Sequence, residues 1–299
     1  MKIFAAPLQG YTDRHFRNAH YSVIGGIEEY YTPFLRLEKD VIREKELPDV
    51  DKKTNLSPET VPQILVKSGA ELAFFAEKLG REMGWKRLDI NFGCPHIPVV
   101  KRGYGAGVLE EKSAIIDVLK ATEKFPFIRF SVKCRLPEKD EKILEIFQEY
   151  PLEKIVLHPR KCSWQYKGTP DKEAFYRFLS SGGKNPVVYN GDIRTVDDVP
   201  EKVDMLMIGR GLLCDPLLAR KIKGEIFPRE EENLLYRKFH GFYVSEILED
   251  TKKADEKLFK LKIFWEYFLL HKDKKIRKKI LKSRSFEEYK ILVEELSAL

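Results

Sequence analysis

Leu88-Asp89-Ile90-Asn91-Phe92-Gly93-Cys94-Pro95 is the stretch of sequence from which the fold can be worked out. The run that ends at Asn91 is short and rich in apolar residues, which is typical of a strand buried on both faces. Gly93 allows a turn directly after the run, and Cys94 follows the glycine. The apolar spacing over Glu111–Glu123 then predicts a helix. The unit is therefore a strand, a loop with polar side chains, and a helix.

The same unit recurs through the first 228 residues. Short apolar runs alternate there with segments of helical spacing, which predicts an α/β fold of the (β/α)8 TIM-barrel type, with a doubly wound open sheet as the alternative. The expected strands are Lys2–Ala6, Ile27–Tyr31, Gln63–Val66, Leu88–Asn91, Ile128–Lys133, Lys154–His158, Pro186–Asn190 and Asp204–Ile208. The expected helices are Asp13–Val23, Ala70–Met83, Glu111–Glu123, Lys142–Tyr150, Lys172–Ser181, Val196–Lys202 and Leu212–Lys223, with a less defined helix over Leu37–Glu46.

From Arg229 onward the strand pattern stops and the apolar spacing becomes helical. This change predicts a small helical bundle, residues 229–299, joined to the barrel, residues 1–228, by a linker at Ile226-Phe227-Pro228. The apolar positions expected to face the bundle core are Leu234, Leu235, Phe239, Phe242, Tyr243, Leu258, Leu261, Ile263, Phe264, Phe268, Leu269, Ile276, Ile280, Leu281, Phe286, Tyr289, Leu292, Val293 and Leu296.

Positive charge is concentrated in one part of this tail. The chain carries 54 Lys and Arg against 47 Asp and Glu, and Lys252–Arg284 alone holds 13 basic residues against four acidic ones. A solvated helix face is one explanation. Contact with a phosphate backbone is favoured, because the rest of the chain is slightly acidic. The cations expected to make this contact are Lys275, Arg277, Lys278 and Lys279.

Composition limits the setting in which the protein works. The sequence has no run of 18 apolar residues, which excludes a membrane-spanning helix, and Pro7 comes too early for a signal peptide. Four cysteines in 299 residues are too sparse for a disulfide framework and show no paired metal-ligand spacing. We therefore expect a cytoplasmic protein, a monomer, with reduced thiols and no metal site.

The residues that can carry chemistry follow the predicted strands. Pro7, Asn91, Lys133, His158, Asn190 and Gly209 stand at or just beyond strand ends. A closed barrel would bring them to one rim, where active sites lie. Arg135 shares a strand face with Lys133, and Arg160 follows His158. The glycine turns Asn190-Gly191 and Gly209-Arg210-Gly211 suit a phosphorylated cofactor such as FMN.

Cys94 is the candidate catalytic residue, as a nucleophile or a proton donor. The alternative is a buried small apolar residue, which is common for a lone cysteine. Cys134 is expected to point away from the face of Lys133 and, like Cys214, to be structural; Cys162 stays undecided.

In their order along the chain, these motifs resemble the tRNA-dihydrouridine synthases. The resemblance rests on Ala6-Pro7-Leu8-Gln9-Gly10-Tyr11-Thr12-Asp13 with Phe16-Arg17, Gln63, Asp89-Ile90-Asn91-Phe92-Gly93-Cys94-Pro95 with Gly103, Gly105 and Ala106, Val132-Lys133-Cys134-Arg135, His158-Pro159-Arg160, Asn190-Gly191-Asp192-Ile193 and Met207-Ile208-Gly209-Arg210-Gly211. It implies an FMN-binding barrel and NADPH-dependent reduction of the uridine C5–C6 double bond in tRNA. A helical domain that binds the RNA would follow the barrel.

The resemblance also implies roles for single residues. Gln63 and Lys133 would contact the flavin ring. His158, Asn190, Gly191, Gly209 and Arg210 would hold the ribityl chain and phosphate, with Pro7 nearby. Asn91, Arg135 and Arg160 would lie on the substrate side, and Cys94 would donate the proton. Three alternatives remain: a flavin-barrel dehydrogenase or ene-reductase for a small molecule, a synthase acting on rRNA, and an RNA-binding protein without catalysis.

Overall fold

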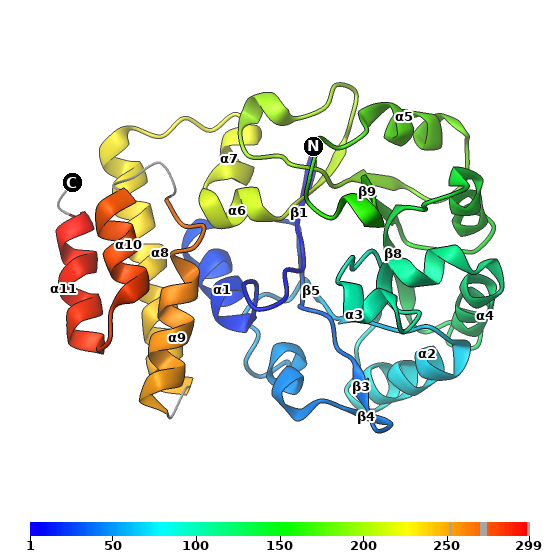
Figure 1. The fold of residues 1–299 in the computed structure, drawn as a ribbon, viewed down its shortest axis with the longest axis horizontal. Coiled ribbons are helices and arrows are strands. Elements are labelled where there is room, and N and C mark those ends of the chain that lie inside the picture. The colour runs from blue at the N-terminus through cyan, green and yellow to red at the C-terminus, as the bar shows by residue number, and fades with distance from the viewer. Residues whose placement is uncertain (251–252, 270–273, 298–299) are drawn as a thin grey trace.

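The computed structural model describes residues 1–250, 253–269 and 274–297 (Figure 1). Its main sheet is built from β1 (Lys2–Ala5), β2 (Glu29–Tyr31), β5 (Thr60–Val61), β6 (Gln63–Ile64), β7 (Arg87–Phe92), β8 (Arg129–Leu136), β9 (Ile155–Lys161), β10 (Val187–Tyr189) and β11 (Met205–Ile208). All of its strand pairs are parallel, in the order β5-β2-β1-β11-β10-β9-β8-β7-β6. Only Pro62 separates β5 from β6, so the two ends of this order meet and the barrel closes. The predicted (β/α)8 barrel is confirmed, and the alternative prediction of a doubly wound open sheet is wrong.

The inside of the barrel holds a small apolar layer below the polar rim. Phe4, Ala6, Tyr31, Val61, Val156, Val188 and Met207 form this buried cluster. The register then places side chains from neighbouring strands side by side, with Asn91 opposite Lys133 and Arg135 opposite His158. Because alternate residues of a strand face inward, these strand ends project into the mouth of the barrel.

Helices surround the barrel where the apolar spacing predicts them, with local changes. They are α1 (Arg14–Ala19) with the π-helix η1 (His20–Ile24), α2 (Gly69–Phe75) with the π-helix η3 (Ala76–Glu82), α3 (Ile97–Val100), α4 (Lys112–Thr122), α5 (Lys172–Ser180), α6 (Arg210–Cys214) and α7 (Leu218–Ile222), and the 3-10 helices η2 (Glu44–Val50), η4 (Gly105–Glu110), η5 (Glu141–Gln148), η6 (Cys162–Trp164) and η7 (Val196–Asp198). The helix expected over Leu212–Lys223 is divided, because Pro216 cannot donate a helical hydrogen bond. The helix expected over Val196–Lys202 shortens to η7.

The prediction of a helix over Leu37–Glu46 is wrong. The chain forms an antiparallel hairpin there, from β3 (Leu37–Glu38) and β4 (Val41–Ile42). Lys39 and Asp40 both adopt left-handed backbone angles, with φ of 52° and 60°. Two consecutive residues in this region make the tight turn of a hairpin and cannot continue a right-handed helix.

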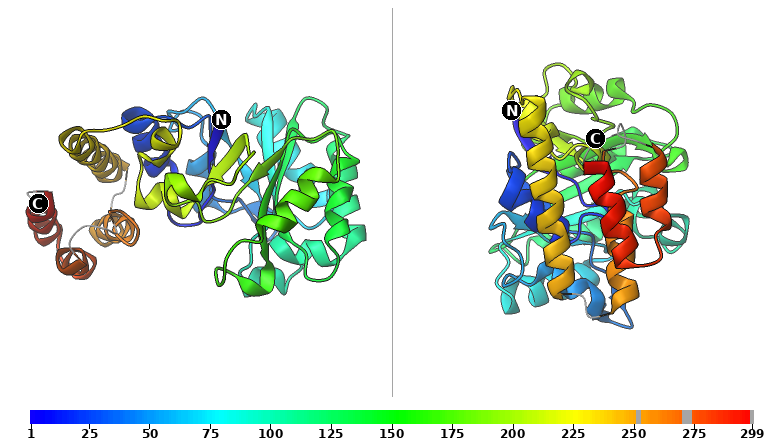
Figure 2. Two further views of the ribbon diagram at one scale, coloured as in Figure 1. Left: turned by 90° about the horizontal axis from the view of Figure 1, so that it is seen from above. Right: turned by 90° about the vertical axis from the view of Figure 1, so that its left-hand side faces the viewer.

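The C-terminal helices α8 (Arg229–Asp250), α9 (Ala254–Phe264), α10 (Lys274–Lys282) and α11 (Phe286–Ser297) stand together at one side of the barrel (Figures 1 and 2). The helix α8 packs on α1, where Phe239 contacts the rings of Phe16 and His20. Arg14 and His15 of α1 also bind Asp250. One continuous apolar core therefore joins the barrel to the bundle. The boundary at residue 228 stays a prediction.

Most apolar positions predicted for the bundle core are buried or partly buried. The prediction for Leu234 is wrong, because 43% of this residue is exposed. The side chain of Leu296 lies outside the described residues, as do Lys252, Lys272 and Asp273 of the basic segment. Across the described ranges, each helix is too short or too polar to span a bilayer.

Candidate active site

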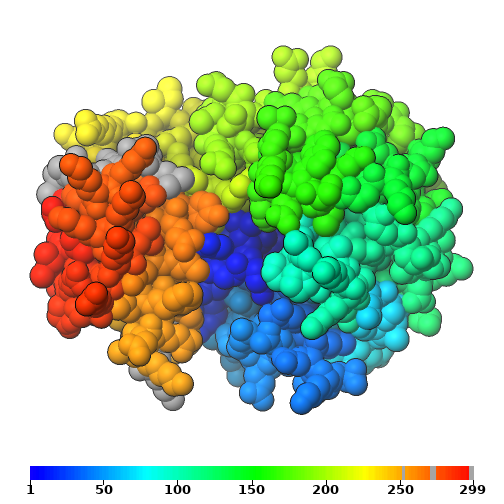
Figure 3. Space-filling view, in the orientation of Figure 1, coloured from blue at the N-terminus to red at the C-terminus, as the bar shows by residue number. Residues whose placement is uncertain are grey.

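A cavity of about 140 Å³ opens at the carboxyl ends of the strands. Figure 3 shows the molecule hollowed here, with the N-terminal segment on the floor between the orange residues of α9 and the cyan-green residues near α3. The structure brings most of the predicted rim residues to this cavity. They are Pro7, Asn91, Cys94, Lys133, Arg135, His158, Asn190, Gly209 and Arg210.

The side chain of Asn91 holds the loop that carries Cys94. The side-chain oxygen of Asn91 accepts hydrogen bonds from the N–H groups of Gly93, at 3.0 Å, and Cys94, at 2.9 Å. Gly105 passes so close that a Cβ atom there would lie 2.7 Å from the Cys94 carbonyl oxygen, and its φ of +58° also favours glycine. Burial raises the pKa of the half-buried Cys94 thiol. The thiol is therefore protonated at neutral pH, as a general acid must be.

Positive charge and an unsatisfied polar group gather along β8 and β9, beside the Cys94 loop. Burial, with a contribution from Arg135, lowers the pKa of Lys133 to about 8, although its side chain remains open to the cavity. Burial and the same cations lower the pKa of His158 well below its ordinary value, so the imidazole is neutral. Its Nδ1 atom is buried and finds no hydrogen-bond partner among the described residues. A buried polar atom of this kind implies a missing partner.

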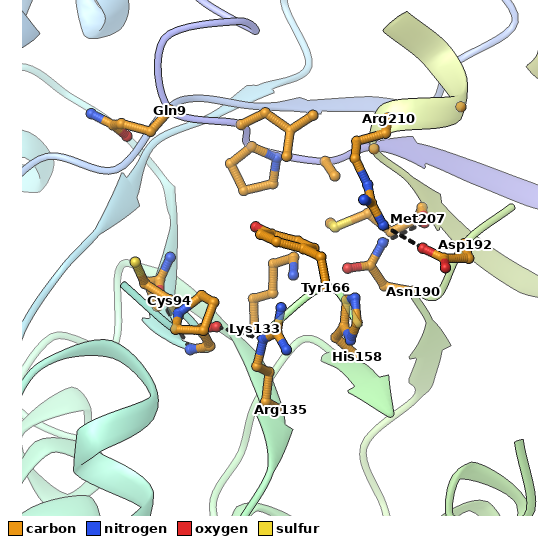
Figure 4. Close-up of a pocket in the computed structure, with 18 of the residues that line it drawn as sticks. Gln9, Cys94, Lys133, Arg135, His158, Tyr166, Asn190, Asp192, Met207 and Arg210 are labelled. Carbon is orange, nitrogen blue, oxygen red and sulfur yellow. Dashed lines mark hydrogen bonds and ion pairs between the residues drawn. The ribbon is translucent and has the colours of Figure 1, made fainter. Parts of the chain in front are cut away.

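Among the described residues that line the cavity, Asp192 alone carries a carboxylate. It accepts a hydrogen bond from Arg160, at 2.6 Å, and another from Arg210, at 2.5 Å, the second of which Figure 4 shows. Burial alone would raise the pKa of Asp192, but these two arginines hold it below its usual value. Lys133 and Arg135 form no ion pair with a described carboxylate. The cavity therefore has an excess of positive charge, which fits a phosphorylated cofactor.

A comparison of the sequence with known families gives one match over almost the whole chain. The model of the family described as dihydrouridine synthase matches residues 4–296. The chain belongs to the dihydrouridine synthase family. It is therefore an enzyme of the oxidoreductase class, and the resemblance predicted from the motifs is confirmed.

Curated relatives of this family are about a quarter identical to the chain over the aligned residues. A protein of Shewanella oneidensis named tRNA-dihydrouridine synthase B is 28% identical over 74% of this chain and 71% of its own. A Ralstonia nicotianae protein named tRNA-dihydrouridine(16) synthase is 25% identical over 75% and 73%. A Xanthomonas campestris protein named tRNA-dihydrouridine(20/20a) synthase is 24% identical over 77% and 73%. The names of the last two give different target positions.

Three residues predicted for the site of this synthase lie behind the cavity wall. Gln63 is fully buried below the rim, with its amide bonded to Asp89 and Asn91. Arg160 is also fully buried, and it donates to Asp192 and to the carbonyl oxygen of Gly168. This placement favours a supporting role for Arg160, and its substrate contact stays a prediction. At Gly191, a Cβ atom would lie 2.8 Å from the Tyr189 hydroxyl, so close packing already requires glycine.

Cys134 and the basic helix lie where the sequence predicts. Cys134 is fully buried outside the cavity, in the core, and burial raises its pKa to about 12. Lys275, Arg277, Lys278 and Lys279 all belong to α10, whose Ile276 and Ile280 face the bundle core. Figure 3 shows α10 and the hollow on one face of the molecule. RNA contact by these cations stays a prediction.

Tyr166 and Asp192 line the cavity but were not assigned from the sequence. The ring of Tyr166 lies over the middle of the cavity (Figure 4), 4.7 Å from the Arg210 guanidinium and 5.3 Å from that of Arg135. Its loop follows β9, and such rim loops are candidates in any barrel. Asp192 follows a glycine after β10, beside two arginines of the neighbouring motifs, and that charge pattern could have indicated it.

Proposed function

We propose that this synthase reduces uridine to 5,6-dihydrouridine in tRNA, with FMN as the cofactor and NADPH as the reductant. The relatives' names support tRNA as the substrate. The observation that carries the proposal is the pairing of Cys94 with the cationic wall formed by Lys133 and Arg210, in one cavity. A protonated thiol that faces a site for an anionic cofactor is the arrangement a reduction with proton transfer needs.

Different residues of the cavity would bind different parts of FMN. Lys133 would place its charge against the flavin ring, with Gln63 beneath it, and Pro7 would lie near the ribityl chain and phosphate. The ribityl chain and phosphate would be held by His158, Asn190, Gly191, Gly209 and Arg210, and the unpaired Nδ1 of His158 fits this role. FMN, once reduced by NADPH, would supply a hydride to C6 of the uracil.

Cys94 completes the reduction. Its Sγ would give a proton to C5 of the uracil, where negative charge develops. Asn91 and Arg135 would hold the base beside the thiol, because both line the cavity next to Cys94. General acid catalysis of this kind contributes about 10²- to 10⁴-fold to the rate.

The helical domain, residues 229–299, would bind the RNA while the barrel, residues 1–228, performs the chemistry. A uridine stacked in folded RNA cannot reach Cys94, so it must be extruded into the mouth at a cost of a few kcal/mol. Contacts between α10 and the phosphate backbone would offset this cost. We place the enzyme in the cytoplasm as a monomer. Its four cysteines all lie in the described ranges as free thiols, which fits a reducing compartment.

The substitution Cys94→Ala tests the proposal. Purified Cys94→Ala protein should retain the flavin absorbance and NADPH oxidation, while dihydrouridine formation on tRNA falls about 10²-fold or more. Cys162→Ala is the matched control, since Cys162 is a partly buried thiol outside the cavity lining. Full dihydrouridine yield from Cys94→Ala would remove the proton-donor role. Protein that binds no FMN, even when FMN is added, would overturn the proposal at its first step.

A further inference from the structure

Asp89 is a buried carboxyl group that the proposed reaction does not use. It lies on β7 inside the barrel and is fully buried below the cavity. Its oxygens accept hydrogen bonds from Nε2 of Gln63, at 2.6 Å, and from the Ser131 hydroxyl, at 2.5 Å. Lys133 and Lys154 act on Asp89 through space, but burial outweighs them; a buried carboxyl group is costly, so its presence needs a reason.

These hydrogen bonds run in one direction toward the Cys94 loop. A carboxylate can only accept, so Gln63 must turn its NH₂ group toward Asp89. The Gln63 oxygen then faces Asn91 and accepts from its Nδ2 at 2.7 Å. The Asn91 oxygen is consequently left to face Gly93 and Cys94, whose N–H groups it accepts at 3.0 and 2.9 Å. Asp89 therefore fixes the orientation of the Gln63 amide, and Gln63 in turn fixes that of the Asn91 amide.

We propose that Asp89 is a positioning residue for Cys94: its ionised carboxylate fixes the amides of Gln63 and Asn91, and these hold the Cys94 loop at the cavity. This inference rests on the proposed function only for the role of the thiol. The chain of contacts reaches Cys94 from Asp89 through two side chains, so Asp89 itself touches neither the thiol nor the cavity.

The reversed arrangement shows why an acceptor is needed at this position. If Gln63 turned its oxygen downward, its NH₂ group would face Asn91, whose own NH₂ group would then meet the N–H groups of Gly93 and Cys94. Donors would face donors, and the loop would leave its place. Burial raises the pKa of Asp89 to about 6, so the group is still a carboxylate at pH 7 and excludes this arrangement.

Alkylation of Cys94 by iodoacetamide in the full-length protein tests the inference without RNA or turnover. Asp89→Leu fills a similar volume but offers no acceptor. We expect Cys94 in this variant to react about fivefold faster or more, with its pH profile moved to lower pH, because the released thiol loses the burial that raises its pKa. Peptide mass spectrometry separates Cys94 from the other thiols.

Two variants distinguish positioning from a merely structural role. Asp89→Asn keeps an acceptor for Gln63 when its NH₂ group donates to the Ser131 hydroxyl, and should restore the wild-type alkylation rate to within about twofold. Ser131→Ala removes the other contact of Asp89 without turning either amide, and should also leave Cys94 unchanged. If thermal melting shows that Asp89→Leu is unfolded, Gln63→Met interrupts the same chain one step later and should give the same acceleration.

An unchanged rate and pH profile in folded Asp89→Leu and Gln63→Met would overturn the inference. Acceleration in Ser131→Ala equal to that in Asp89→Leu would also overturn it, since general loosening would then be the cause. The outcome is separate from that of the proposed function: full dihydrouridine yield from Cys94→Ala would remove the acid role, yet alkylation would still report whether Asp89 positions the loop.

Discussion

The two ends of the barrel both contain buried charged side chains, but they differ in how far these charges are paired. The foot is the end of the barrel at which the strands begin. There, Lys154 donates to Glu29 at 2.6 and 2.8 Å. Arg87 also contacts Glu29, and it donates to Glu153 at 2.9 Å. Each charge there has a partner of opposite sign. At the mouth, Lys133 has no ion pair to a described carboxylate. The paired charges at the foot stabilise the fold, whereas the unpaired positive charge at the mouth favours the binding of an anionic ligand.

The largest expected effect is at the foot. Lys154→Met would leave Glu29 buried with a weaker set of partners, and breaking such a buried pair costs about 3 kcal/mol of unfolding free energy. Urea denaturation of the cofactor-free protein measures this loss, while FMN affinity should stay unchanged. A loss below about 1 kcal/mol would mean that Arg87 alone satisfies Glu29, and that the foot is less dependent on matched charges than its contacts indicate.

The same substitution at the mouth should have the opposite pattern. Lys133→Met removes a cation that forms no ion pair with a described carboxylate. Burial and Arg135 oppose its charge more than Asp89 favours it, so the cofactor-free protein should lose almost no stability. FMN affinity should fall about ten- to a hundredfold, the equivalent of one hydrogen bond to a charged group. Flavin fluorescence titration and urea denaturation measure the two effects. Wild-type FMN affinity in this variant would contradict the assignment of the cationic wall.

The unbalanced charge of the mouth continues onto the bundle. Replacing the exposed Lys278 and Lys279 of α10 by Gln should weaken tRNA binding about tenfold, and reduce the slope of log affinity against log salt by about 1 to 2. Filter binding at several salt concentrations measures both. The matched control replaces Lys120 and Lys124, at the end of α4 across the barrel from the bundle, and should change neither (Figure 1). Equal losses in both pairs would indicate non-specific attraction.

The sequence predicts the position of a site residue when that residue stands at the end of a strand. It does not predict the position when contacts with a distant chain segment determine it. Lys133, His158 and Asn190 were predicted because the strand period and the rim rule place them without further information. Tyr166 was missed because the conformation of its loop is set by tertiary contacts. The bond between Asp89 and Gln63 depends on the register of two strands that the sequence does not define.

The hairpin at residues 37–42 shows the same limit within a short segment. Lys39 and Asp40 carry no glycine signal for the left-handed turn they adopt, so local spacing there favoured a helix. Residues whose position depends on the chain's own period were predictable, and residues whose position depends on a distant partner were not.

The smallest expected effect is a pH dependence that only the mouth should show. The folded-state pKa of Lys133, about 8, lies below its ordinary value of about 10.4. The folded protein therefore binds fewer protons than the unfolded chain between these values, and this group adds stability as pH rises from about 8 to about 10. Over the same range the loss of the charge weakens anion binding. FMN affinity should be about fourfold lower at pH 8.5 than at pH 7 through this one proton.

Lys133→Met is the reference for this measurement, because changes in the phosphate of FMN affect both proteins equally. Isothermal titration at the two pH values should show the extra loss in wild type alone. The foot should show no such alkaline response. Burial would raise the pKa of Glu29, but Lys154 and Arg87 hold it below its ordinary value, so its stabilisation is lost only as the pH falls into the acid range. Parallel affinity curves for wild type and Lys133→Met would show that Lys133 keeps its proton, and that the mouth is better compensated than its contacts indicate.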